Sequence, residues 1–144
     1  MTSLRTGPVL TFSAKTPLQI TVALGGLVPV GAGLAGIILG PAMAGRGAVD
    51  ASLDSHFSYL SGLLLAVGLA FWGLIPGIER RGHQVRLLTW LVMVGGLGRL
   101  VSLRRVGPPD SAMQAALIME LVVTPAICLW QWRLAGALTR AEQG

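Results

Sequence analysis

Two charged residues, Arg99 and Glu120, stand out because each lies inside a long apolar stretch of the 144-residue chain. A charge within hydrocarbon is costly unless it is paired or hydrated. The two residues are equally far in sequence from the turn predicted at Pro108-Pro109-Asp110. Antiparallel helices joined by that turn would hold both side chains at the same depth, about 12 Å below the membrane surface. We therefore expect an ion pair between them.

Further polar side chains precede or begin the second apolar stretch, where Asp54, His56 and Tyr59 follow one another closely. In the expected topology they approach the membrane from the same outer side as Arg99 and Glu120. The five side chains would then line an outward-facing polar pocket that binds the head of a lipid-like ligand. The favoured interpretation gives the Arg99–Glu120 pair a structural role instead, in which it fastens two helices together.

The residue types give little indication of metal binding, haem binding or nucleophilic catalysis. His56 and His83 are expected on opposite sides of the membrane, so no two-histidine metal or haem site is predicted. The apolar stretches contain no lysine for a Schiff base, and Cys128 has no nucleophile motif around it. We expect no metal, no cofactor and no catalytic residue. Any enzyme would depend on acid–base work by Glu120, Asp54 or His56.

The elements that position these residues follow from composition and hydropathy. Hydrophobic residues make up 53% of the chain, charged residues only 12%, and the mean hydropathy is +0.70. Apolar stretches occupy residues 18–40, 59–78, 87–103 and 112–135. About 20 apolar residues are needed to cross a bilayer as a helix, and the alternation typical of barrel strands is absent. We predict an all-α integral membrane four-helix bundle that forms a single domain over residues 1–144.

Basic residues indicate the orientation of the chain, whose net charge is +5. One side of the predicted topology carries seven of them: Arg5, Lys15, Arg80, Arg81, Arg86, Arg133 and Arg140. The other side carries three: Arg46, Arg104 and Arg105. This bias predicts that both termini are cytoplasmic, and all of the tryptophans fall near the same side. Because the charges flank apolar stretches, they do not indicate nucleic-acid binding.

Four short motifs resemble a known family. They are Leu53-Asp54-Ser55-His56-Phe57 continuing into Tyr59-Leu60-Ser61-Gly62, then Gly95-Gly96-Leu97-Gly98-Arg99-Leu100-Val101-Ser102, Gly107-Pro108, and Met119-Glu120-Leu121. Over residues 18–135 the chain is similar to the bacterial family described as domain of unknown function 4345, whose members are small four-helix membrane proteins. The resemblance implies a bacterial inner-membrane location and no particular activity. It also implies an arginine where this chain has Ser58.

Three functional hypotheses follow. An accessory or structural subunit that packs against a larger membrane complex, or against copies of itself, is preferred over an enzyme. The alternative is a binding protein or membrane enzyme for a lipid-like molecule, with its polar pocket around Arg99 and Glu120. A small transporter ranks last, because four-helix multidrug exporters need an acid in the first span and residues 18–40 have no charge. Expected partners are membrane lipids and other membrane subunits, with no nucleic acid.

Overall fold

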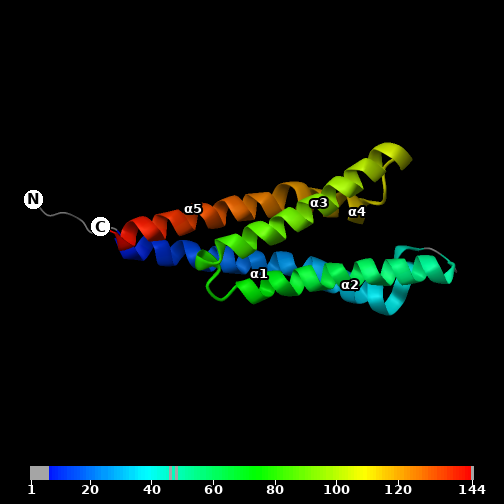
Figure 1. The fold of residues 1–144 in the computed structure, drawn as a ribbon, viewed down its shortest axis with the longest axis horizontal. Helices are drawn as coiled ribbons and strands as arrows, with labels where there is room; N and C mark the ends of the chain where they lie inside the picture. The colour runs from blue at the N-terminus through cyan, green and yellow to red at the C-terminus, as the bar shows by residue number, and fades with distance from the viewer. Residues whose placement is uncertain (1–6, 46, 48, 144) are drawn as a thin grey trace, which may run out of the picture. The chain divides into compact units, whose positions relative to one another are not determined.

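The structure is a computed structural model that describes residues 7–45, 47 and 49–143. Within those ranges the chain forms helices and connecting turns, and no strand occurs there (Figure 1). Four helical segments are long and apolar enough to span a membrane: Lys15–Met43, Ala51–Leu74, Gly82–Val106 and Ser111–Ala141. The prediction of an all-α, multi-pass membrane protein with four spanning helices is therefore confirmed.

The first helix and the start of the second are set by local backbone chemistry. Helix α1 (Gly7–Leu39) gives way to a 3₁₀ turn (Gly40–Ala44) at Gly40, whose φ of +58° is rarely adopted by other residues. Helix α2 (Ala51–Leu74) starts ahead of the predicted Tyr59. The carboxylate of Asp50 explains this earlier start, because it accepts hydrogen bonds from the amides of Ser52 and Leu53 at 2.9 and 3.1 Å.

Turn residues likewise set the ends of the second and third helices. Pro76 lacks an N–H and Gly77 has a φ of +82°, so α2 stops at Leu74. A short 3₁₀ turn (Ile78–Arg80) leads into α3 (Gly82–Val106), which ends where Gly107 takes a φ of +104°.

The fourth span is a continuous helix with one irregular turn. It consists of α4 (Ser111–Ile118), a π-helical turn (Met119–Val123) and α5 (Thr124–Glu142). Pro125 has no N–H, and its ring would clash with the carbonyl of residue 121 in a regular helix. The wider turn relieves that clash, and the Thr124 hydroxyl donates to the carbonyl of Met119 at 2.8 Å. Glu120 therefore lies in a π turn.

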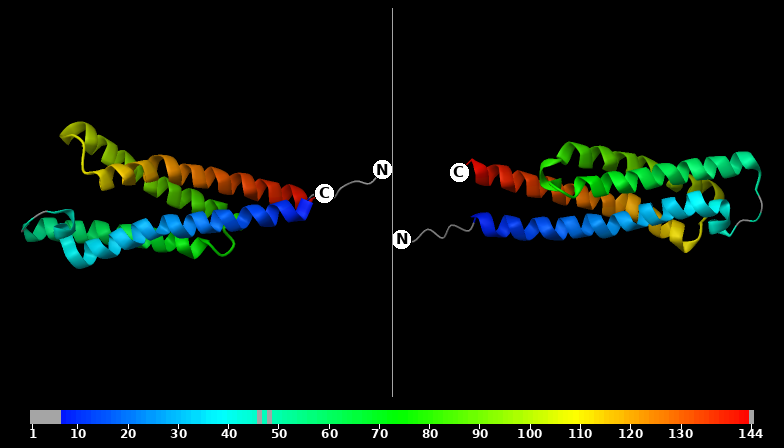
Figure 2. Two further views of the ribbon diagram at one scale, coloured as in Figure 1. Left: turned by 180° about the vertical axis from the view of Figure 1, so that it is seen from behind. Right: turned by 90° about the horizontal axis from the view of Figure 1, so that it is seen from below.

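The chain divides into two compact units, which are described separately. The first comprises Met1–Gln19 with Pro76–Gly144, and the second comprises Ile20–Ile75. In the first unit α3 and α5 run side by side in opposite directions (Figures 1 and 2). The least exposed large side chains of the described residues all belong to this unit: Leu18, Ile78, Val85 and Gln131. Its best-packed part thus surrounds the connection into α3.

In the second unit, α1 and α2 lie side by side at very short range (Figure 2). A Cβ atom added to Gly33 would lie 2.6 Å from the Leu65 nitrogen and 2.7 Å from the Ser61 carbonyl oxygen. The Trp72 indole N–H donates to the carbonyl of Ala23 at 3.0 Å. Small residues therefore let the two helix backbones touch, as they do in many membrane helix pairs.

Replacing Gly33 with Ala tests this close approach. We expect Gly33→Ala to destabilise the protein by about 1–3 kcal/mol, because the added methyl group meets backbone atoms that cannot move aside. Gly31→Ala is the matched control on the same helix, since nothing lies within 4 Å of its added Cβ. The control should be neutral or stabilising by up to about 1 kcal/mol. Thermal unfolding in detergent, followed by circular dichroism, measures both; equal midpoints would contradict the packing.

Candidate functional site

The ion pair predicted between Arg99 and Glu120 is present in the first unit. Arg99 Nε donates to Glu120 Oε1 at 3.0 Å. The side chains are 37% and 15% exposed, respectively, so the acid is the more deeply placed partner. Arg99 precedes the end of α3 by seven residues and Glu120 follows the start of α4 by nine, or about 10 and 13 Å of helix. Both charges therefore lie at similar depth within the spans.

Gly96 explains how the two helices come close enough to form this pair. A Cβ atom at Gly96 would lie 2.8 Å from the Cδ2 atom of Leu121 and 3.0 Å from the Cβ atom of Glu120. A larger residue at Gly96 would press against both side chains of the π turn. Arg99 follows three residues later, which places it on the same face of α3. The glycine, the π turn and the ion pair form one local arrangement.

Both members of the pair retain hydrogen-bonding capacity. Arg99 Nη1 also contacts the sulfur atom of Met113 at 3.0 Å, but a thioether is a weak acceptor. The second carboxylate oxygen of Glu120, Oε2, is buried and has no hydrogen-bond partner among the described residues. Because a guanidinium carries five N–H groups, Arg99 has donors for an additional acceptor. The site is suited to a polar group that both donates and accepts.

The turn between α3 and α4 is held by its own polar residues. Asp110 caps α4 by accepting a hydrogen bond from the Met113 amide at 3.0 Å. The Gln114 side chain donates to the carbonyl of Pro109 at 2.8 Å. These bonds fix the start of α4, and with it the Met113 sulfur that contacts Arg99.

The other three predicted site residues belong to the second unit. Asp54, His56 and Tyr59 lie in the first turns of α2 and are exposed, Tyr59 to 63%. A Cβ added to Gly40 would lie 2.8 Å from Asp54 Oδ1, so this carboxylate borders the end of α1. A pocket shared by these three residues with Arg99 and Glu120 stays a prediction. No group of three or more potential metal ligands occurs in the part of the chain that the structure describes.

A second polar cluster in the first unit was not predicted from the sequence. Lys15 Nζ and Glu79 Oε1 form an ion pair at 2.8 Å. Gln131, which is fully buried, donates to the carbonyl of Ile78 at 2.9 Å. In the sequence, Lys15 counts only as one of the basic residues that indicate orientation. Gln131 is the available signal, because it is one of only two amide side chains, with Gln114, in the apolar stretch 112–135. These contacts attach the turn before α3 to α1 and α5.

Comparison with known proteins places the chain in a family. The family described as domain of unknown function (DUF4345) matches residues 17–131. The chain belongs to this family. The matched segment includes all five predicted site residues and agrees with the resemblance seen over residues 18–135. No curated protein and no solved structure matches the chain. This member of DUF4345 is thus a small multi-pass membrane protein.

The Lys15–Glu79 pair predicts a loss of stability in acid. Burial alone would raise the pKa of Glu79, but the hydrogen bond and charge of Lys15 outweigh it and hold this pKa below its ordinary value. Because the folded pKa is depressed, the stabilisation is complete above the unfolded pKa of about 4.3 and is lost as the pH falls through the folded value. The apparent unfolding temperature of the wild type should therefore drop below about pH 4.3.

The Glu79→Gln variant isolates the contribution of this pair. It should unfold at a lower temperature than the wild type at pH 7 and show a smaller change between pH 7 and pH 3.5. Asp110→Asn changes an acid that caps α4 and serves as the control for general acid effects. If Glu79→Gln and the wild type lose the same stability on acidification, the pair is not the source of the effect.

Proposed function

We propose that this DUF4345 protein is an accessory or structural component of a membrane assembly, in which the Arg99–Glu120 pair fastens α3 to the fourth span. The observation that carries the proposal is the 3.0 Å ion pair inside two membrane-length helices. Each charge compensates the other where neither lipid tails nor water does. Removing one partner of a buried pair typically costs about 3–5 kcal/mol, because the remaining charge is stranded.

The surface of the fourth span supports association within the membrane. None of its most apolar 18-residue window is buried inside the chain. Large apolar side chains such as Ile118, Val122 and Leu129 are 58%, 60% and 47% exposed. These side chains must be covered by lipid or by other helices. Such a face suits a subunit that packs against a larger complex or against copies of itself.

The same proposal includes a location in the bacterial inner membrane, with both termini on the cytoplasmic side. It is supported by the bias of basic residues towards one set of helix ends. Of the residues counted for that bias, Arg5 and Arg46 lie outside the described residues. The others lie near the ends of the spans or between them, as Arg86 does in the second turn of α3 and Arg81 does just before it.

A second candidate function is the binding of a lipid-like molecule with a polar head. The observation that favours it is the hydrogen-bonding capacity left at the pair, namely the spare donors of Arg99 and the buried Oε2 atom of Glu120. A head group that carries an acceptor and a donor would satisfy the spare N–H groups of Arg99 and the Oε2 atom of Glu120. In this case the ion pair would bind the ligand and would also hold α3 against the fourth span.

A charge-swap experiment separates the two candidates. We expect Glu120→Gln to lower the amount of folded protein in the membrane several-fold, because it strands the Arg99 charge. The double variant Arg99→Glu/Glu120→Arg re-forms the pair with reversed signs and should restore folding in part. Arg104→Gln is the matched control, since Arg104 is exposed at the end of the same helix. Membrane yield and the unfolding temperature in detergent are measured for all four proteins.

Native mass spectrometry after gentle extraction then distinguishes assembly from ligand binding. A structural component should be recovered with stoichiometric protein subunits or as a defined oligomer, and the double variant should regain that assembly. A ligand-binding protein should carry one discrete small mass, which the folded double variant would lose. If Glu120→Gln accumulates and assembles as well as Arg104→Gln, the fastening role is wrong.

A further inference from the structure

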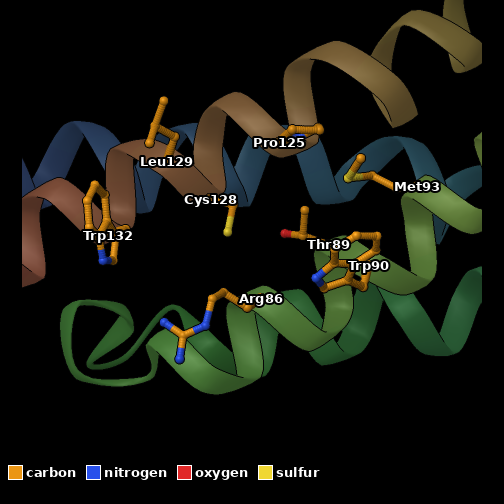
Figure 3. A pocket seen from close by; sticks show the side chains of 8 residues that line it. All are labelled: Arg86, Thr89, Trp90, Met93, Pro125, Cys128, Leu129 and Trp132. Atoms are coloured by element: carbon orange, nitrogen blue, oxygen red, sulfur yellow. The ribbon is translucent and has the colours of Figure 1, made fainter.

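A groove of about 530 Å³ lies within the first unit, between α3 and α5 (Figure 3). The lining residues come from these two helices alone: Arg86, Thr89, Trp90 and Met93 from α3, with Pro125, Cys128, Leu129 and Trp132 from α5. Trp90 and Trp132 are 64% and 60% exposed, so the groove is open along its side. It shares no residue with the Arg99–Glu120 site.

The chemistry of the lining changes in layers along the groove. Arg86 lies in the second turn of α3, near the end of that span, and Trp132 lies at the same end on α5 (Figure 3). Thr89 follows three residues further in, about 4.5 Å along the helix. Met93 and Pro125 line the deepest part and offer only apolar surface. The order from the span end inward is therefore cation, hydroxyl, then apolar side chains.

Thr89 differs from the other hydroxyl residues whose bonds are described. Ser61 and Thr139 both donate to carbonyls four residues earlier in their own helices, at 2.8 and 3.1 Å. The Thr89 hydroxyl has no hydrogen-bond partner among the described residues, although the residue is only 5% exposed. Figure 3 shows this oxygen directed into the space between α3 and α5. A buried, unbonded hydroxyl is costly, so it points to an acceptor supplied from outside the chain.

We propose that this groove is a binding site for one anionic phospholipid of the surrounding membrane. The phosphate would pair with Arg86, which is exposed at the end of the span, and no acidic residue lines the groove to compete for it. In a phospholipid, the ester carbonyls lie one step deeper than the phosphate, where they reach Thr89. An acyl chain then covers Met93 and Pro125. Basic pockets between spanning helices bind anionic head groups by this chemistry.

The same layering argues against an apolar helix as the occupant. A helix that packed along the groove would cover the deep apolar part, but its apolar side chains would leave the buried Thr89 hydroxyl without an acceptor and would make no use of the exposed Arg86 cation. The aromatic rings of Trp90 and Trp132 suit the boundary between head groups and tails. The site is also independent of the proposed function, because Arg86 and Arg99 are 13 residues apart on α3, about 20 Å along its axis.

Lipid competition measured by native mass spectrometry tests the proposal with the full chain. The protein is placed in nanodiscs that contain equal amounts of phosphatidylglycerol and phosphatidylcholine, and retained lipids are counted after release. The wild type should retain one phosphatidylglycerol in preference to phosphatidylcholine. Arg86→Gln should lower that preference about tenfold, whereas Arg86→Lys should keep most of it. Thr89→Val should lower the retention of both lipids about fivefold and leave the preference unchanged, because the ester carbonyls are common to both. Arg133→Gln removes an exposed charge beside Trp132 that does not line the groove, and it should match the wild type.

Three results would overturn the site. The first is equal retention of the two lipids by the wild type, and the second is an Arg86→Gln preference no different from that of Arg133→Gln. The third is recovery of a second copy of the chain or another polypeptide that is released by Arg86→Gln, because the groove would then be a protein contact. Circular dichroism of each variant establishes that it is folded.

Cys128 gives a readout that needs no variant. It is the only cysteine in the chain, and it lines the groove with intermediate exposure. In detergent, phosphatidylglycerol added to the wild type should slow alkylation of Cys128 by N-ethylmaleimide at least threefold, in a saturable manner. Phosphatidylcholine should have a smaller effect. Equal protection by both lipids, or none, would contradict an anionic lipid in the groove.

Discussion

A hydrocarbon interior supplies no hydrogen-bond partner, and this constraint governs the first unit of the structure. Arg99 and Glu120 lie within spans, so each must find its counter-charge in the chain. The requirement brings α3 against the fourth span at a fixed register. Gly96 permits the contact because any larger side chain would meet Leu121 and Glu120. The π turn that carries Glu120 is in turn a response to Pro125, which cannot take part in a regular helical ladder.

The spans and the ion pair were predictable because their signals are strong and local. A long apolar stretch has few alternatives to a membrane helix, and two isolated charges placed evenly about a turn have few partners other than each other. Helix starts were less predictable. Hydropathy placed the second helix at Tyr59, whereas the Asp50 cap starts it at Ala51, since capping depends on one polar side chain in a segment where hydropathy is uninformative.

Features that depend on the register between distant segments could not be predicted. The Lys15–Glu79 pair joins residues separated by 64 positions, and Lys15 looked like any basic residue that flanks a span. A proline such as Pro125 disrupts the hydrogen bonds of a helix, but a single sequence does not say whether the helix bends there or widens into a π turn. The groove is harder still, because it requires that Thr89 and Cys128 face the same space, which only the packing of α3 on α5 decides.

Arg99 and Arg86 lie at different depths in the membrane span formed by α3, and their charges are compensated in different ways. Arg99 lies too far from the span end for its charge to be met by head groups, so the chain provides Glu120 at 3.0 Å. Arg86 lies within two turns of the helix start and has no acid beside it in the groove. A phosphate of the bilayer is available at that depth, and a protein carboxylate would compete with it. An acid near Arg86 would fasten the helices more firmly, but its absence leaves the cation available to the membrane.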